Sequence, residues 1–267
     1  MKYKLIGLYV VLILVIYYIE KNTKKKVFLT YGNDRFKNSR KRIINESKSL
    51  NIFDKHILET DRTIINDIEL KKQLKNENFK KVYESEKGGG YYIWKPYILY
   101  KHLSKLNDGD ILVYCDAGCE IQKEPGKFNK IFNDLIHGKY NVFLSDISYN
   151  IRGPYKFFSE KMWTKGDVLK YHNVYDNDKV LNENQIECNR VFIIKNNNSM
   201  KFITKLWSIA KNNPELFDDS ESKIKNKNDF KENRHDQSNM SILCKLYDEC
   251  SIIKENDNPL KAKRIRE

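Results

Sequence analysis

An apolar run that ends abruptly in a carboxylate constrains this chain more than any other feature. Residues 111–115 read Ile-Leu-Val-Tyr-Cys, and Asp116 follows them directly. A run rich in β-branched and aromatic side chains predicts a strand buried on both faces of a parallel sheet. Because ligands of open α/β sheets bind outside the carboxyl ends of the strands, Asp116 is expected at the ligand-binding edge.

A glycine and aromatic block lies shortly before this strand. Residues 88–96 read Gly-Gly-Gly-Tyr-Tyr-Ile-Trp-Lys-Pro, and the apolar pattern of residues 94–106 predicts a helix with Pro96 in its first turn. The chain therefore passes from a glycine loop through an aromatic and cationic cluster to a helix, a strand and an acid. This order indicates one wall of a binding site.

Strand and helix patterns alternate along the rest of the chain. This alternation predicts one α/β domain with a doubly wound, Rossmann-like, mixed and mostly parallel sheet. We expect strands at residues 26–32, 53–60, 111–115, 140–144 and 190–194, and helices at 35–50, 61–76, 94–106, 125–137 and 200–211. Ile64, Ile65 and Ile68 are expected to face the core, and Ser199 is expected to cap the last of these helices.

The charge of the chain leaves two interpretations open. The 267 residues carry a formal net charge of +13 at pH 7, which favours an anionic partner. The lysines are spread along the whole chain, which fits a general compositional bias equally well. They do not gather on one helix face and no nucleic-acid-binding module is recognisable, so we expect no nucleic-acid partner.

Residues 5–19 form an uninterrupted apolar run with lysines on both sides. At ~1.5 Å per residue a helix here would be ~23 Å long, and flanking lysines and tyrosines could extend it across the ~30 Å hydrocarbon core of a bilayer. No small residues follow the run, so an uncleaved single-pass membrane anchor is expected in preference to a signal peptide. The positive-inside rule would keep the globular part in the cytosol, and a lumenal arrangement is the alternative.

These patterns divide the chain into three parts. We expect an N-terminal hydrophobic anchor helix and its basic flank in residues 1–25, a globular domain in residues 26–255, and a charged, frayed tail in residues 256–267. Within the domain, the polar residues 218–233 predict a mobile loop. The following block, Arg-His-Asp-Gln-Ser at 234–238, begins the last predicted helix.

Five cysteines show no metal-binding spacing: Cys115, Cys119, Cys188, Cys244 and Cys250. An odd number argues against a disulfide scaffold, so buried free thiols are expected.

Four blocks together resemble a family of GT-A glycosyltransferase-like proteins, related to capsular-polysaccharide and mannosyl-type transferases of bacteria and large DNA viruses. The blocks are Tyr31-Gly32, residues 88–96, residues 110–119 and residues 234–238, and the resemblance spans about residues 27–250. It implies a single GT-A-like domain and a nucleotide-diphosphate sugar donor.

The resemblance implies that Tyr31 and Gly32 hold the nucleotide base and that Asp116 is the first acid of an Asp-x-Asp metal motif. Gly118 stands where the second acid would be. A Mn²⁺ or Mg²⁺ ion on the pyrophosphate would then be held by Asp116 with water, or with help from Glu120 or His235, and metal-independent binding is the alternative.

The other site residues have competing interpretations. Asp236 could deprotonate an acceptor hydroxyl, or cap the N-terminus of its helix. Lys95 and Arg234 could meet the diphosphate, or be solvated. Tyr91 and Trp94 could stack on a sugar or base, or belong to the core. The last expected donor-binding residue is Gln237, which lies in the 234–238 block.

The sequence therefore predicts a membrane-anchored glycosyltransferase that moves a sugar from a nucleotide-diphosphate sugar to a hydroxyl of a glycan, lipid or protein. The polar 218–233 loop would close over the donor and exclude water. A non-catalytic, membrane-tethered protein that binds nucleotide-sugars or glycans is the alternative, and a phosphate-handling hydrolase is a third interpretation. The chain lacks the Gly-rich motifs of P-loop and dinucleotide-binding proteins.

Overall fold

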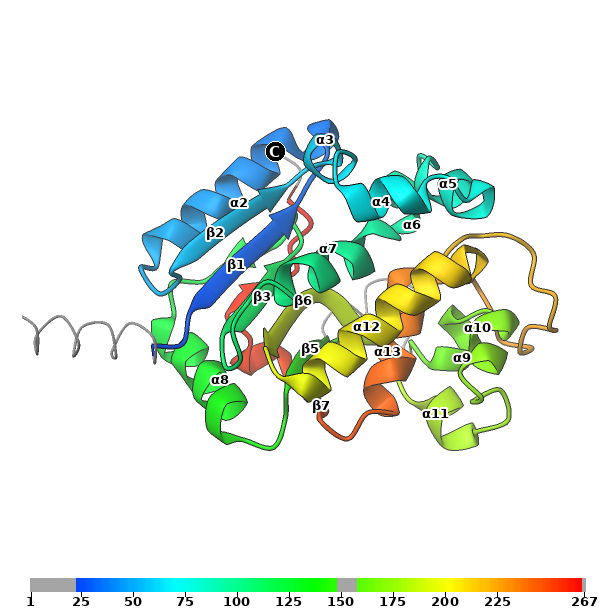
Figure 1. Ribbon diagram of the computed structural model, residues 1–267. Helices are drawn as coiled ribbons and strands as arrows, with labels where there is room; N and C mark the ends of the chain where they lie inside the picture. Colours follow the sequence, from blue (N-terminus) through cyan, green and yellow to red (C-terminus); the bar gives the residue numbers. More distant parts are fainter. Residues whose placement is uncertain (1–22, 148–157, 266–267) are drawn as a thin grey trace, which may run out of the picture.

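The computed structural model describes residues 23–147 and 158–265, and a six-stranded sheet organises them (Figure 1). Its order is β2-β1-β3-β6-β5-β7. Strands β1, β2 and β3 are mutually parallel, β5 and β7 are parallel, and β6 runs antiparallel to both β3 and β5. The predicted α/β fold with a mixed, mostly parallel sheet is therefore confirmed. The strands are β1 Lys26–Tyr31, β2 Lys55–Glu59, β3 Ile111–Cys115, β5 Val142–Asp146, β6 Ile186–Ile194 and β7 Cys250–Ile253.

Helices cover both faces of the sheet, which makes three layers (Figure 1). Helices α2 and α8 lie on one side, and α7, α12 and α13 lie on the other. The longer helices are α2 Lys37–Ser49, α7 Trp94–Leu103, α8 Pro125–His137, α12 Asn197–Asn212 and α13 Asp236–Lys245. Shorter ones are α3 Asp61–Ile64, α4 Ile68–Gln73, α5 Glu77–Tyr83, α6 Gly88–Tyr91, α9 Glu160–Trp163, α10 Gly166–Tyr171 and α11 Asp178–Asn182, with 3-10 turns at Asp34–Phe36, Pro214–Leu216 and Glu255–Asp257.

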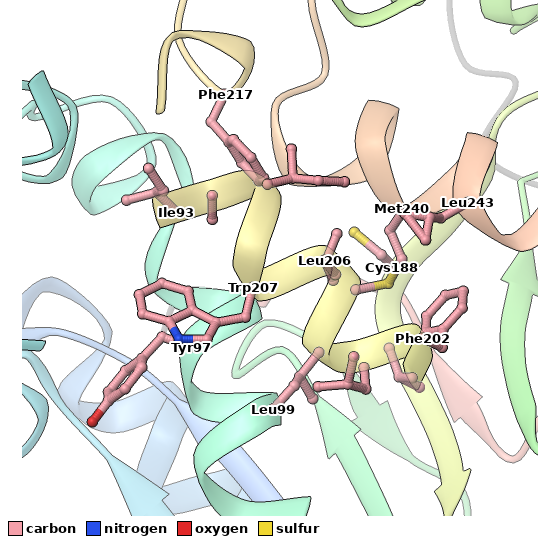
Figure 2. Packing of buried hydrophobic residues seen from close by; sticks show 14 of the residues in the cluster. Ile93, Tyr97, Leu99, Cys188, Phe202, Leu206, Trp207, Phe217, Met240 and Leu243 are labelled. Atoms are coloured by element: carbon pink, nitrogen blue, oxygen red, sulfur yellow. The ribbon is translucent and has the colours of Figure 1, made fainter. Parts of the chain in front are cut away.

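Alternating side chains of the strands feed two separate hydrophobic clusters. In β3, Leu112 and Tyr114 face the α7 and α12 side, whereas Val113 faces the α2 and α8 side. Figure 2 shows the first cluster, in which Trp207 of α12 packs against Tyr97 of α7 with ring centroids 5.1 Å apart. Both faces of the sheet are therefore buried against helices.

The helix predicted over residues 61–76 is wrong as a single element. Helix α3 ends at Ile64, and the side chain of Asp67 accepts a hydrogen bond from the backbone N–H of Glu69, which starts α4 anew. The break resets the helical period, so Ile64 is buried while Ile65 and Ile68 are 44% and 86% exposed. The predicted cap of α12 is also displaced, because Asn196 is the N-cap and Ser199 is its capping-box partner.

The C-terminal segment does not fray within the described residues. Strand β8 Leu260–Lys261 pairs with β4 Glu120–Ile121, and Leu260 is fully buried. Figure 1 shows this red segment running toward α2 at the upper end of the sheet. The prediction of a frayed tail from residue 256 is therefore wrong up to residue 265, because short-strand pairing and burial tie the segment down.

Two further expectations concern the N-terminus and the cysteines. The predicted anchor at residues 5–19 lies outside the described residues, and no helix in the part that the structure describes is long and apolar enough to cross a membrane. Cys244 and Cys250 form a disulfide, contrary to the expectation of five free thiols, because the turn after α13 returns the chain to β7. Cys115, Cys119 and Cys188 are buried free thiols, as predicted.

Candidate functional site

A cavity of about 670 Å³ lies at the carboxyl ends of β1 and β3. The two strands are adjacent and parallel, so Tyr31 at the end of β1 and Asp116 just past β3 reach the same edge. All four sequence blocks contribute to the lining, although they are far apart in the chain. The lining includes Tyr31, Gly32, Gly88, Gly89, Trp94, Lys95, Asp116, Gly118, Arg234, His235, Asp236 and Gln237.

The floor of the cavity is a lysine held between two carboxylates. Lys95 Nζ lies 2.8 Å from Asp236 Oδ2 and 3.3 Å from Asp116 Oδ1, and the lysine side chain is only 2% exposed. The hydroxyl of Tyr114 donates to Asp116 Oδ1, and the thiol of Cys188 donates to Asp236 Oδ2 over 3.0 Å. Among the described residues, these contacts leave Oδ2 of Asp116 and Oδ1 of Asp236 for a ligand.

Burial and pairing perturb the groups of the floor in different ways. The side chain of Asp116 is 32% exposed, and its partial burial raises the pKa of the carboxyl group and outweighs the lowering by Lys95 and Tyr114. Burial lowers the pKa of Lys95, but Asp116 and Asp236 outweigh it and hold that pKa well above its ordinary value. Lys95 is therefore a permanent internal cation. The alternative that Lys95 is solvated is wrong, because its buried ammonium group pairs with the two carboxylates.

Aromatic rings form the wall beside the floor. The rings of Tyr31 and Trp94 stack with centroids 3.7 Å apart, and the indole N–H of Trp94 donates to the backbone oxygen of Gly88 over 3.3 Å. Trp94 is 4% exposed, so most of its surface belongs to the core while its edge lines the cavity. Tyr91 does not line the cavity and packs against the His235 ring at 5.1 Å.

The glycine block forms a tight turn, because every residue from Gly88 to Tyr92 has positive φ. A Cβ on Gly90 would lie 2.4 Å from the backbone oxygen of Tyr83, so only glycine fits there. The other non-glycine residues with positive φ include His235 and Arg264, which also line the cavity. Backbone strain of this kind concentrates at functional sites.

The 234–238 block presents its polar groups in three directions. Arg234 stacks on the Trp163 ring at 4.3 Å and pairs with Glu232 at 3.1 Å. His235 Nε2 lies 2.9 Å from Asp219 Oδ1, and burial lowers the pKa of this histidine despite that carboxylate.

Asp236 and Gln237 complete the block. His235 is the N-cap of α13, so Asp236 is not the cap, and its carboxylate turns to Lys95 instead. Gln237 lines the cavity and donates to the side-chain oxygen of Gln185 over 2.7 Å.

The residues present do not fit the predicted metal site. No group of three or more His, Cys, Asp or Glu side chains among residues 23–147 and 158–265 is placed to hold a metal ion. Glu120 lies in β4 and does not line the cavity, and His235 is bonded to Asp219. The ammonium group of Lys95 occupies the place between the two carboxylates where a cation would bind. Use of Mn²⁺ or Mg²⁺ stays a prediction.

The polar segment 218–233 has no helix or strand, as predicted, but it is tied to α10. The carboxylate of Asp167 accepts the backbone N–H groups of Lys223 and Ile224, and Asn226 accepts the N–H of Gly166 over 2.7 Å. No residue of the segment lines the cavity. Closure of this loop over a ligand stays a prediction.

Several lining residues were not predicted from the sequence: Arg35, Lys87, Glu187, Cys188, Asn189, Ala262 and Arg264. Arg35 could have been found, because it follows the exit of β1 by four residues and the exits of parallel strands meet at one edge. Nothing in the sequence signals that a residue near the C-terminus reaches the same cavity.

Comparisons with known proteins find likenesses in structure alone. No family model matches the sequence, and no curated protein matches it. A glycosyltransferase involved in the glycosylation of the major capsid of PBCV-1 is 10% identical with a TM-score of 0.38, over 71% of this chain and 69% of that chain. The galactosyltransferase LgtC, solved with donor and acceptor sugar analogs, is 12% identical with a TM-score of 0.37, over 85% of this chain and 72% of that chain. At these values, the likenesses assign neither a family nor an activity to this chain.

Proposed function

We propose that this protein is a glycosyltransferase that uses a nucleotide-diphosphate sugar as donor and a hydroxyl group as acceptor. One observation carries the proposal. The four blocks that resemble GT-A transferases converge on one cavity at the carboxyl edge of the sheet, with Asp116 and Asp236 on its floor. Two carboxylates in a site of this size suit a sugar, whose hydroxyl groups need hydrogen-bond acceptors.

The floor residues have distinct roles in this proposal. Asp236 accepts the proton of the acceptor hydroxyl through Oδ1 as the new bond to the anomeric carbon forms and the bond to the diphosphate oxygen breaks. Asp116 orients a donor hydroxyl through Oδ2. Lys95 keeps both carboxylates in place, since its Nζ contacts the other oxygen of each. The nucleoside diphosphate leaves with the bonding electron pair.

The stacked Tyr31 and Trp94 suit the other end of the donor. Both residues line the cavity together with Gly32, so a base or ribose could pack against the part of the rings that is exposed there. The acceptor is a hydroxyl of a glycan, lipid or protein in this proposal. The assay with a mixture of glycan acceptors tests which hydroxyl compound accepts the sugar.

The test is a screen of UDP-, GDP- and CDP-sugars for release of the nucleoside diphosphate, with and without a mixture of glycan acceptors. We expect one donor to be consumed faster with an acceptor present, and a glycosylated product to be found by mass spectrometry. Donors that stabilise the protein thermally without turnover would instead support a binding protein. Release of inorganic phosphate without an acceptor would support a hydrolase.

A further inference from the structure

Two arginines of the cavity differ from its other cations. Lys87 pairs with Asp219 at 2.6 Å, and Lys95 and Arg234 also have carboxylate partners. Arg35 and Arg264 line the same cavity, yet their side chains make no ion pair or hydrogen bond with any residue in the described ranges. Unpaired guanidinium groups in a concave site are suited to bind an anion, because they offer a planar fork of donors.

The wall that carries Arg264 is built into the fold. The backbone N–H of Ile265 donates to the oxygen of Gly118 over 2.9 Å, and the hydroxyl of Ser39 donates to the oxygen of Ile265 over 3.1 Å. The pairing of β8 with β4 anchors the same segment a few residues earlier. Arg264 itself has a φ of +55°, a conformation that a non-glycine residue adopts at a cost.

The C-terminal segment lies next to Gly118, the position where the resemblance would place a second acid. A Cβ added to Gly118 would lie 3.5 Å from Arg264 Cα and 3.6 Å from the backbone oxygen of Ile265. Both distances are ordinary van der Waals contacts, so a methyl group fits against the backbone of the C-terminal segment. The backbone of a cationic residue, Arg264, therefore lies beside Gly118 just past the strand end.

Because the floor carries a net negative charge, binding of a diphosphate here needs positive charge from other residues of the cavity. Lys95 neutralises only one of its two carboxylates, so the floor by itself would repel a diphosphate when both are ionised. Burial is the main cause that lowers the pKa of the Arg234 guanidinium, and the nearby positive charge of Arg264 lowers it further. The arginines that line the cavity carry the positive charge that the floor lacks.

We propose that Arg35 and Arg264 bind the diphosphate of the donor directly, and that the C-terminal segment is a wall of the binding site, with no divalent cation on Asp116. This inference rests on the proposed function for the identity of the ligand as a nucleoside diphosphate. The two guanidinium groups donate to the phosphoryl oxygens next to the ends of β1 and β3.

The test is calorimetric titration of the full chain with UDP, GDP and inorganic pyrophosphate in buffer with EDTA, repeated with excess Mn²⁺. We expect at least one probe to bind in EDTA, and Arg35→Gln and Arg264→Gln each to weaken it about tenfold. Lys263→Gln is the matched control, because this exposed neighbour of Arg264 does not line the cavity and its loss should leave the affinity unchanged.

Three results would overturn the inference: binding only with Mn²⁺, equal affinity in the arginine variants and the wild type, or no binding of any probe. A transferase assay separates this inference from the proposed function. Arginine-dependent binding without sugar transfer would reject the transferase and keep the diphosphate site. Sugar transfer with an unchanged donor KM in Arg264→Gln would keep the transferase and reject the site.

Discussion

Helix α7 carries two lysines that each bridge two carboxylates, and only one of them faces the cavity. Lys95 lies 2.8 Å from Asp236 and 3.3 Å from Asp116, and Lys101 lies 2.8 Å from Glu59 and 3.5 Å from Asp67. The distances are nearly the same. The surroundings differ, because the side chain of Lys95 is 2% exposed and that of Lys101 is 14% exposed.

The carboxylates of the two clusters respond in opposite directions. Burial raises the pKa of Glu59, but hydrogen bonds from His102, Lys101 and Thr63 outweigh it and lower that pKa to about 2. At Asp116 burial outweighs the pairing and the pKa is raised. Glu59 is thus ionised at neutral pH and has a structural role. A carboxyl group with a raised pKa in a cavity is typical of a functional site.

The largest expected difference between the clusters is in activity. Asp236→Asn keeps the size of the side chain but removes the proton acceptor, so we expect kcat to fall by roughly 10²–10⁴-fold. Glu59→Gln, in the Lys101 cluster, should leave kcat within a few-fold. The measurement is initial-rate kinetics with the donor found in the screen.

Circular dichroism and thermal unfolding of both variants provide the control, since each must be folded at the assay temperature. Equal losses of kcat in the two variants would mean that Asp236 matters only for the scaffold. The proposed proton transfer would then be wrong.

The next effect is on stability. Lys95→Met leaves the buried Asp236 and the partly exposed Asp116 without their cation, so we expect a loss of roughly 3–5 kcal/mol in the free energy of unfolding. Lys101→Met should cost less, about 1–2 kcal/mol, because His102 and Thr63 still bond Glu59. Urea denaturation measures both.

A double variant sharpens this result. Asp236→Asn removes one of the two stranded charges, so Lys95→Met combined with Asp236→Asn should be less destabilised than the sum of the single changes. Additive losses would show that the ion pair between Lys95 and Asp236 contributes little.

The sequence predicted the position of Asp116 but not its partner. A buried strand delivers the residue after it to the sheet edge whatever the tertiary detail, and the five predicted strands are all present. The ion pairs of Lys95 depend on how α7 packs against the sheet. The spacing of apolar residues in that helix does not reveal this packing. Most of α7 is buried, including Pro96 and Lys95 itself.

The C-terminal wall was missed for a different reason. It depends on two strands of two residues each, β4 and β8, and such short pairing has no periodicity that a sequence reveals. The Cys244–Cys250 disulfide was missed because an odd number of cysteines does not say which of them meet. The local pattern of apolar residues was enough to predict the main helices and strands. These contacts, in contrast, depend on how the chain folds back on itself.

The pH dependence of stability should also separate the clusters. The folded-state pKa of Glu59 lies below its unfolded value of 4.5, so its contribution is present above pH 4.5 and is lost as pH falls through about 2. This contribution is about 3 kcal/mol. The pKa of Asp116 is raised instead, so any contribution of its protonated form is present at low pH and lost as pH rises through the raised value.

Urea unfolding from pH 7 to pH 2 tests these signs. Glu59→Gln should lose stability at pH 7 and show a flatter acid limb than the wild type. Asp116→Asn should be at least as stable as the wild type at pH 7, because an amide escapes the cost of burying a charge. A destabilised Asp116→Asn would mean that the pair with Lys95 outweighs burial.

The smallest expected effect comes from Gly118, which lies beside the C-terminal segment that carries Arg264. Gly118→Ala adds a methyl group in van der Waals contact with the C-terminal segment, so the nucleoside-diphosphate affinity in EDTA should change less than about twofold. Gly118→Asp should weaken it about tenfold, since a carboxylate beside the C-terminal segment would compete with the diphosphate for Arg264. The titration is repeated with Mn²⁺, because an affinity restored by the ion would show that this edge can use a cation on two acids. Unchanged binding in Gly118→Asp would mean that neither Arg264 nor its segment contacts the diphosphate.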